Sequence, residues 1–590
     1  MNRAASLPFD IRVLRRMRLS SAPGRTAEQA AGKQEHPIRL TGERIGHGRQ
    51  ARSRVLITIL CFAMLYALIG VRLTQYGLES EGTVASIGPA DKLMASRPDL
   101  VDRNGEVLAT DIRTVSLYAE PNKIVDPDEA IERLATVLPD LDVRTTYRKL
   151  SSSSRFQWLR RQLTPRQQSQ ILALGIPGIG FRPEKRRFYP GGPTASHIVG
   201  HVNIDNKGIA GMEKFVDGQG LGDLAAVGLT VDETLEPVRL SLDLRVQNVL
   251  RDELAAAMQR YQAIAAGGVV LDIHTGEVLA MSSLPDYDPN NPVEALEKDR
   301  LNRMSAGTFE MGSTFKAFTT AMALDSGKVR FTDTFDARKS IRIGGFTISD
   351  FHGKNRVLTV PEIFIYSSNI GTARMADVVG IEAQREFLTR IGLLTRLETE
   401  LPEVATPTQP KVWKKINSIT ISFGHGVATT PLQTAVAAAA LMNGGKLIEP
   451  TFRPRSRDEA AKFAEQVIRP QTSEELRQLM RMNVEQGSGR RAEVDGFRVG
   501  GKTGTAEKVV NGRYSSKVRF NAFLSAFPID DPQYVVLVII DEPKPEEGKH
   551  YATAGMNAAP TVGAIIRRSA GFLGIKPVFG NGEAVAGLTY

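Results

Sequence analysis

A strongly apolar stretch of 17 residues without a charge lies near the start of the chain, at 55–71 (VLITILCFAMLYALIGV). Arg54 and Arg72 bracket it, and both side chains are long enough to reach the aqueous interfaces of a bilayer. This length is at the short end for a membrane-spanning helix. The pattern therefore predicts one transmembrane signal-anchor helix over 55–72.

The region before this apolar stretch, 1–54, lacks sustained hydrophobic periodicity, and we expect it to be a disordered tail. It holds 12 Arg and Lys residues against 4 acidic ones. By the positive-inside rule the basic tail stays in the cytoplasm, and the rest of the chain lies across the inner membrane, in the periplasm.

Between 236 and 575 the hydrophobic pattern alternates between sheet and helix periods. It predicts an amphipathic helix at Leu244–Tyr261, a β-hairpin over 268–282 and a three-stranded meander over 499–540. An Ala-rich, almost uncharged segment at 431–443 predicts a buried helix. Two early strands and three late ones give a five-stranded antiparallel sheet flanked by helices, an α+β fold.

The region 73–235 has mixed strand and helix patterns and groups no nucleophile with a base. Asp102–Ala109 includes an Asn-Gly turn between two strands, and helices are expected over 128–150, capped by Asp126 and Asp140. We therefore expect a non-catalytic α+β pedestal domain at 73–235, the catalytic domain at 236–575 and a short C-terminal tail at 576–590.

Charge and cysteine content narrow the function classes. The formal net charge is +10, but +8 of it belongs to the tail, so the sequence does not predict a nucleic-acid-binding surface. Cys61 is the single cysteine, so no disulfide can form within 73–590. His197 and His201 have helical spacing, but no Glu lies between them and Gly200 interrupts a helix. We expect no metal site.

Ser313 and Lys316 stand three positions apart in FEMGSTFKAF (309–318). The apolar spacing that follows predicts a helix, with Ser313 as its N-cap and the lysine amine on the same face. A serine hydroxyl becomes a good nucleophile when a base takes its proton, and a desolvated lysine can be neutral enough to do so. Such a tetrad also arises by chance, so alone it is a weak signal.

Two further motifs, each found once, change this interpretation: the S-x-N at 367–369 and K-T-G-T at 502–505. S-x-x-K, S-x-N and K-T-G in this order are the signature of serine acyl-transferases of the penicillin-binding and β-lactamase type. We expect 361–379 to be helical around the S-x-N. On the later strand, alternation places Lys502 and Gly504 on one face. The predicted catalytic residues are Ser313, Lys316, Ser367, Asn369 and Lys502, and the predicted substrate-binding residues are Thr503, Gly504 and Thr505.

The chain resembles the class B penicillin-binding proteins, most of all their division-specific peptidoglycan D,D-transpeptidases. Beyond the three motifs, the resemblance includes the strings DRNGEVLA (102–109), GIAGMEKFVD (208–217), GGVVLDIHTGEVLAM (267–281), SFGHGVATTPLQ (422–433) and VGGKTGTAEK (499–508). It extends from the apolar stretch to about residue 570. Met311 stands where the family usually has a proline.

The resemblance implies a mechanism. Ser313, with Lys316 as base, attacks the penultimate carbonyl of a stem peptide that ends in D-Ala-D-Ala. The terminal D-Ala leaves, protonated through Ser367 and Lys502, and the amine of a second stem peptide then attacks the acyl-enzyme. β-Lactams acylate the same serine. Neither a metal nor an organic cofactor is implied. The implied partners are lipid-linked nascent glycan, an FtsW-type glycan polymerase and other division proteins at the septum.

Three alternatives remain open from the sequence. An elongation-type transpeptidase of the same class has the same motifs. A D,D-carboxypeptidase or a β-lactamase also uses them, although the predicted pedestal and membrane anchor argue against both. From a different class, the chain could be an inactive wall-binding scaffold or a β-lactam sensor.

Overall fold

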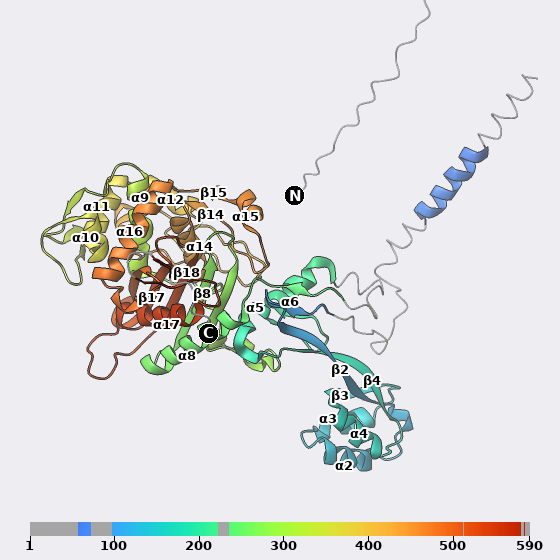
Figure 1. Ribbon diagram of the computed structural model, residues 1–590. Coiled ribbons are helices and arrows are strands. Elements are labelled where there is room, and N and C mark those ends of the chain that lie inside the picture. Colours follow the sequence, from blue (N-terminus) through green and yellow to red (C-terminus); the bar gives the residue numbers. More distant parts are fainter. Residues whose placement is uncertain (1–56, 72–96, 222–234, 511, 580–582, 585–590) are drawn as a thin grey trace, which may run out of the picture. The chain divides into compact units, whose positions relative to one another are not determined.

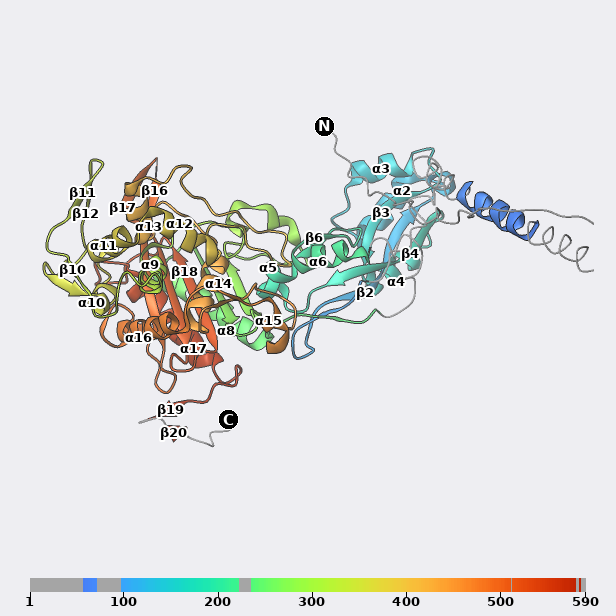
Figure 2. The same ribbon diagram turned by 90° about the horizontal axis from the view of Figure 1, so that it is seen from above.

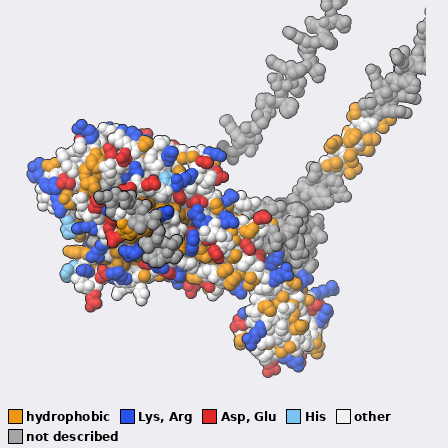
Figure 3. Space-filling view, in the orientation of Figure 1, with side chains coloured by type: hydrophobic (Ala, Val, Ile, Leu, Met, Phe, Trp, Pro, Cys, Tyr) orange, Lys and Arg blue, Asp and Glu red, His pale blue; other side chains and the backbone are white. Residues whose placement is uncertain are grey.

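The computed structural model describes residues 57–71, 97–221, 235–510, 512–579 and 583–584. The chain divides into two compact units, Met1–Lys92 and Leu93–Tyr590. In the first unit the described residues, 57–71, form one helix whose apolar side chains are exposed (Figure 3). Parts of the predicted 55–72 span lie outside the described residues. None of the helices within the described residues has the length and apolar character needed to cross a bilayer.

The first part of the second unit is built on a five-stranded sheet of order β3-β2-β1-β7, in which β4 also pairs with β2. As predicted, a turn at the Asn-Gly pair separates two antiparallel strands, which pair Leu100 with Ala109. The last strand, β7, comes from beyond position 235 and runs parallel to β1. The strands are β1 (Leu100–Val101), β2 (Val107–Ala119), β3 (Gln157–Leu163), β4 (Ile179–Phe188) and β7 (Val238–Arg239).

Helices and short strands complete this region: α2 (Pro127–Val137), α3 (Val143–Leu150), α4 (Pro165–Ala173), α5 (Ser196–Val199), β5 (His201–Val202), β6 (Gly208–Ala210) and α6 (Gly211–Val216). Asp126 caps α2, as predicted, by accepting from the Asp128 and Glu129 amides. The prediction of Asp140 as a second cap is wrong. Asp142 caps α3 instead, because its carboxylate lies close enough to accept from the Thr145 amide.

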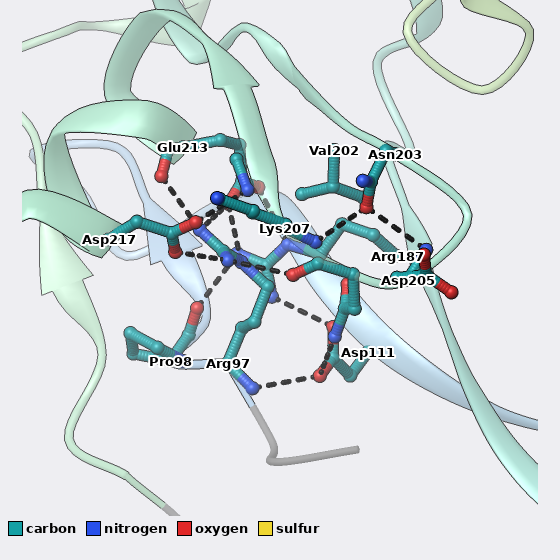
Figure 4. Close-up of polar contacts among 12 residues, drawn as sticks. Arg97, Pro98, Asp111, Arg187, Val202, Asn203, Asp205, Lys207, Glu213 and Asp217 are labelled. Carbon is teal, nitrogen blue, oxygen red and sulfur yellow. Dashed lines mark hydrogen bonds and ion pairs between the residues drawn. The ribbon is translucent and has the colours of Figure 1, made fainter. Parts of the chain in front are cut away.

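A buried cluster of ion pairs connects the segments of this region (Figure 4). The Glu213 carboxylate accepts from Arg187 Nε at 2.7 Å and from Arg97 Nε at 2.8 Å. Asp111 and Asp217 neutralise the outer sides of the two guanidinium groups. Since both arginines and Glu213 are almost fully buried, each charge depends on its partners for solvation.

The second part contains the predicted antiparallel sheet, with strand order β16-β17-β18-β8-β9. The early and late strands meet where β18 pairs with β8, Tyr534 opposite Asp272. The N-terminal and C-terminal strands of this domain therefore lie side by side. The strand β16 forms one edge of the sheet. The strands are β8 (Ala265–Asp272), β9 (Val278–Leu284), β16 (Gly500–Val510), β17 (Arg513–Phe527) and β18 (Tyr534–Asp541).

Helices cover both faces of this sheet (Figures 1 and 2). On one face α8 (Leu244–Tyr261) and α17 (Ala558–Ser569) pack together over the side chains of Val270 and Phe523. On the other face three helices share a larger core with Val269 and Leu537: α9 (Phe315–Asp325), α14 (Pro431–Met442) and α16 (Pro470–Gln486). The prediction that the Ala-rich segment is buried is confirmed, because every residue of α14 is buried. The sheet thus serves as a rigid base for the helical side that carries the first two motifs.

The remaining elements of the second part are short strands and helices. The helices are α8 (Leu244–Tyr261), α9 (Phe315–Asp325), α10 (Val360–Ile365), α11 (Asn369–Val379), α12 (Ile381–Arg390), α13 (Lys415–Ser422), α14 (Pro431–Met442), α15 (Arg457–Phe463), α16 (Pro470–Gln486) and α17 (Ala558–Ser569). The short strands are β10 (Thr334–Asp336), β11 (Ile341–Ile343), β12 (Phe346–Ile348), β13 (Val357–Thr359), β14 (Lys446–Leu447), β15 (Glu465–Gln466), β19 (Val578–Phe579) and β20 (Glu583–Ala584).

Candidate active site

Ser313 lies in a single 3-10 turn, Gly312–Thr314, directly before α9. The prediction that Ser313 caps the helix is wrong. Gly312 starts the turn at φ 52°, so the helix begins two residues after Ser313 and Thr314 takes the N-cap position. The Thr314 hydroxyl donates to the Met311 carbonyl at 2.7 Å. Ser313 is half-buried, and its hydroxyl makes no hydrogen bond within the described residues, so it is available to a substrate.

Three glycines hold this turn against the neighbouring backbone. A Cβ on Gly504 would overlap the Met311 carbonyl oxygen, and one on Gly424 would overlap the Gly312 carbonyl oxygen. A Cβ on Gly312 itself would lie 3.1 Å from the Thr505 carbonyl. The turn is therefore clamped between β16 and the segment after α13, and this contact fixes where Ser313 stands.

The S-x-N motif lies at a break between two helices, which corrects the prediction of one helix over 361–379. Ser367 has φ 55°, a left-handed conformation that an α-helix does not allow, so α10 ends before it and α11 starts after it. Ser368 caps α11 by accepting from the Gly371 amide at 3.0 Å. The break directs Ser367 away from the helix axis, toward Lys316 and Lys502.

Lys316 is fully buried and lies at the centre of a polar network. Its Nζ donates to the Ser367 carbonyl at 2.5 Å and to Asn369 Oδ1 at 2.7 Å, and lies 3.1 Å from Ser367 Oγ. Burial, followed by the charge of Lys502, holds the pKa of Lys316 well below its ordinary value, while Asp350 acts in the opposite direction. A neutral amine has two N–H groups for the first two acceptors and keeps a lone pair that can take a proton.

Lys502 reaches the same serine from β16. Its Nζ donates to Ser367 Oγ at 3.0 Å and to its neighbour Thr503 O at 3.3 Å, and lies 5.7 Å from the centre of the Phe364 ring. Burial lowers the pKa of Lys502 to about 7. Two lysine amines thus share one hydroxyl, and burial lowers the pKa of each. Such a chain can pass a proton from one amine to the other.

The rest of the K-T-G-T motif follows the predicted alternation. Lys502 and Gly504 face the Ser313 turn, whereas Thr503 and Thr505 face the other side, where their hydroxyls contact Ser488 Oγ and the Ala554 amide. The sequence predicts Gly504 as a substrate-binding residue. The close neighbours of its missing side chain are Met311 and Thr314, so the residue makes room for the turn that carries Ser313.

The structure brings together residues that the sequence did not single out. Asp350 anchors the S-x-N loop by accepting from Ser368 Oγ at 2.7 Å and from the Ile370 amide at 3.0 Å. The neighbouring Ser349 carbonyl accepts from Asn369 Nδ2 and fixes the orientation of that amide. No local pattern marks Asp350, which lies 18 residues before its partner. Within the described residues, no three His, Cys, Asp or Glu side chains are grouped to hold a metal.

Comparison with known proteins places this geometry in a family. Residues 266–567 match the penicillin binding protein transpeptidase domain, and residues 92–221 match the penicillin-binding protein dimerisation domain. A probable peptidoglycan D,D-transpeptidase FtsI from Caulobacter vibrioides is 40% identical over 83% of both chains.

Two further relatives extend the comparison. A probable peptidoglycan D,D-transpeptidase PenA from Neisseria gonorrhoeae is 33% identical over 91% of this chain and 95% of its own. The stage V sporulation protein D of Bacillus subtilis is 28% identical over 89% of this chain and 86% of its own. Since both domain models match in order and the relatives align over most of their length, the chain belongs to the class B penicillin-binding proteins.

Proposed function

We propose that this protein is a peptidoglycan D,D-transpeptidase that cross-links stem peptides through an acyl-Ser313 intermediate. The observation that carries the proposal is the network around Ser367, in which Lys316 and Lys502 share Ser367 Oγ while burial lowers the pKa of both amines. Family membership supports the same activity, because the relatives include proteins named as peptidoglycan D,D-transpeptidases.

In the first half-reaction Ser313 Oγ attacks the penultimate carbonyl of a stem peptide ending in D-Ala-D-Ala, and Lys316 takes its proton. Ser367 passes a proton from the lysine pair to the leaving D-Ala amine. The backbone N–H groups of Ser313 and Thr505 stabilise the oxyanion, and one such donor is typically worth about 2.7–4 kcal/mol. The two donors lie on neighbouring backbone segments, because a Cβ on Gly312 would stand 3.1 Å from the Thr505 carbonyl.

The donor peptide lies along the edge of β16, where an extended chain can add a strand. At the strand edge its terminal carboxylate meets the hydroxyls of Thr503 and Thr505, and Asn369 holds a substrate amide. Gly504 keeps the Ser313 turn close to this strand. In the second half-reaction the amine of another stem peptide attacks the acyl-Ser313 ester and forms the cross-link. A β-lactam acylates Ser313 in the same way, but its adduct is not transferred.

We further propose a septal role with the domain plan predicted from the sequence. In this plan 1–54 is a cytoplasmic tail, 55–72 anchors the chain in the inner membrane, 73–235 is the pedestal, 236–575 is the periplasmic transpeptidase domain and 576–590 is a tail. The similarity to FtsI supports division, with an FtsW-type polymerase and other division proteins as partners. An elongation role is the nearest alternative, and the relative named as a sporulation protein illustrates other uses of the same architecture.

Depletion of the protein in its native cells tests the septal role. Filamentous cells with blocked septa support it, whereas rounded cells support the elongation alternative. Catalysis itself is tested by chromosomal replacement with Ser313→Ala. Loss of cross-linking and of viability is expected, and normal division with this variant would favour a scaffold or sensor.

A further inference from the structure

A second polar cluster lies beside Ser313 and takes no part in the steps above. Gly424 packs directly on the Gly312 carbonyl, so the next residue, His425, borders the turn that carries Ser313. Glu310 precedes the same turn by two residues, and Tyr514 reaches the cluster from β17. Three segments far apart in the sequence thus place titratable side chains at the reacting serine.

Direct contacts order this cluster. The Tyr514 hydroxyl donates to both carboxylate oxygens of Glu310, at 3.0 and 3.2 Å. The Gly426 amide donates to Glu310 Oε1 at 2.8 Å. The rings of His425 and Tyr514 meet edge to face with centres 5.5 Å apart. Glu310 and Tyr514 therefore determine where the imidazole stands.

The two nitrogens of His425 differ in their surroundings. Nδ1 is buried and has no hydrogen-bond partner in the described structure. The ring as a whole is only partly buried, so a substrate can reach its open side. Burial lowers the pKa of His425, Lys316 lowers it further, and the carboxylates of Glu310 and Glu507 act in the opposite direction. The ring is thus a neutral base at physiological pH, next to negative charge.

We propose that His425 is the base for the second half-reaction and takes a proton from the amine that attacks the acyl-enzyme. This inference rests on the proposed transpeptidase function. An alkyl amine arrives as an ammonium ion and has to lose one proton before it can attack. The neighbouring carboxylates attract the cation, and Nε2 accepts the proton.

The proton balance assigns a separate task to each base. The ammonium gives its first proton to His425, and the free amine attacks the ester carbonyl. As the C–N bond forms and the C–O bond to Ser313 breaks, the amine gives a second proton through Lys316 to Ser313 Oγ. The products are an amide, a free serine hydroxyl and a protonated His425, which releases its proton to water.

The test compares acylation with transfer in the full-length protein. The variant His425→Gln keeps a polar side chain of similar size but has no basic nitrogen. The control His274→Gln removes an imidazole in the β8–β9 turn, at the other end of the sheet from β16. Acylation is measured with a fluorescent penicillin. Transfer is measured with a stem-peptide fragment ending in D-Ala-D-Ala and two acceptors: Nα-acetyl-lysinamide, which is an ammonium ion at neutral pH, and hydroxylamine, which is already neutral.

For His425→Gln we expect penicillin acylation within about twofold of the parent, while transfer to the lysine amine, relative to hydrolysis, falls about 100-fold or more. Hydroxylamine should restore most of the transfer, and raising the pH should recover transfer to the lysine amine. His274→Gln should behave as the parent.

Unchanged transfer to the lysine amine in His425→Gln would overturn the inference and leave the transpeptidase function intact. An equal loss with both acceptors would also overturn it, because that result assigns His425 to the positioning of the site. Failure of the parent protein to form any acyl-enzyme would instead reject the proposed function itself.

Discussion

Lys502 Nζ donates a hydrogen bond to Ser367 Oγ at 3.0 Å across 135 residues of sequence. The bond joins the edge strand of the sheet to the break between α10 and α11. Because Lys316 Nζ contacts the same oxygen at 3.1 Å, removal of this one hydroxyl should break the connection between the two amines.

Ser367→Ala should therefore slow acylation by a fluorescent penicillin by about 100-fold or more, the range expected for loss of a proton-transfer group. The adjacent Ser368→Ala is the matched control. It removes the α11 cap and the contact with Asp350, so it should lower the free energy of unfolding by about 1 kcal/mol or more and slow acylation much less than Ser367→Ala does. Equal acylation rates in the two variants would contradict the proposed relay.

Replacement of Lys502 by Met should change the pH dependence of acylation. The charge of Lys502 lowers the pKa of Lys316, so its loss raises that pKa and protonates the base at pH values where the parent is neutral. The acid limb of the pH–rate profile should therefore move to higher pH. Lys502→Arg keeps the charge and should leave this limb in place. A shift to lower pH in Lys502→Met would show that the sign of the coupling is wrong.

Gly504→Ala should disturb the Ser313 turn although it alters no reacting atom. The added methyl would overlap the Met311 carbonyl, so β16 and the turn have to move apart at a cost of about 1–3 kcal/mol. Both the unfolding temperature and the acylation rate should fall. Gly571→Ala, where a Cβ meets nothing within 4 Å, should change stability by less than about 0.5 kcal/mol. Normal acylation in Gly504→Ala would mean that the clamp does not position Ser313.

Glu213→Gln should destabilise the pedestal cluster of Figure 4, because two buried guanidinium groups lose their shared counter-charge. Breaking such a buried pair costs about 3–5 kcal/mol. Glu294→Gln breaks an exposed pair with Arg300 and should cost less than about 1 kcal/mol. Thermal unfolding of the two variants measures the difference, and similar unfolding temperatures would contradict a stabilising role for the cluster.

The sequence predicted the sheet well because its strands are long, alternate regularly and are separated by clear turn signals. The early hairpin and the late meander lie where they were expected, and they join into one sheet through the pairing of β8 with β18. The order of the three motifs also predicted that Lys316, Ser367, Asn369 and Lys502 converge.

Local backbone conformation was the part that periodicity could not predict. The left-handed Ser367 breaks a pattern that continues through it as a helix, and the turn at Gly312 moves the helix start past Ser313. Both depend on tertiary contacts. The same is true of His425, Glu310 and Tyr514, which come from three segments. The short G-H-G pattern at 424–426 was the one available signal, since it places a titratable residue between two flexible ones.

The central claim is that Ser313 is the acylated nucleophile. The most direct measurement is mass spectrometry of the protein after reaction with a penicillin, followed by peptide mapping of the adduct. The account predicts one penicilloyl group on the peptide that contains Ser313, and no adduct in Ser313→Ala. An adduct on any other residue, or one that persists in Ser313→Ala, would contradict it.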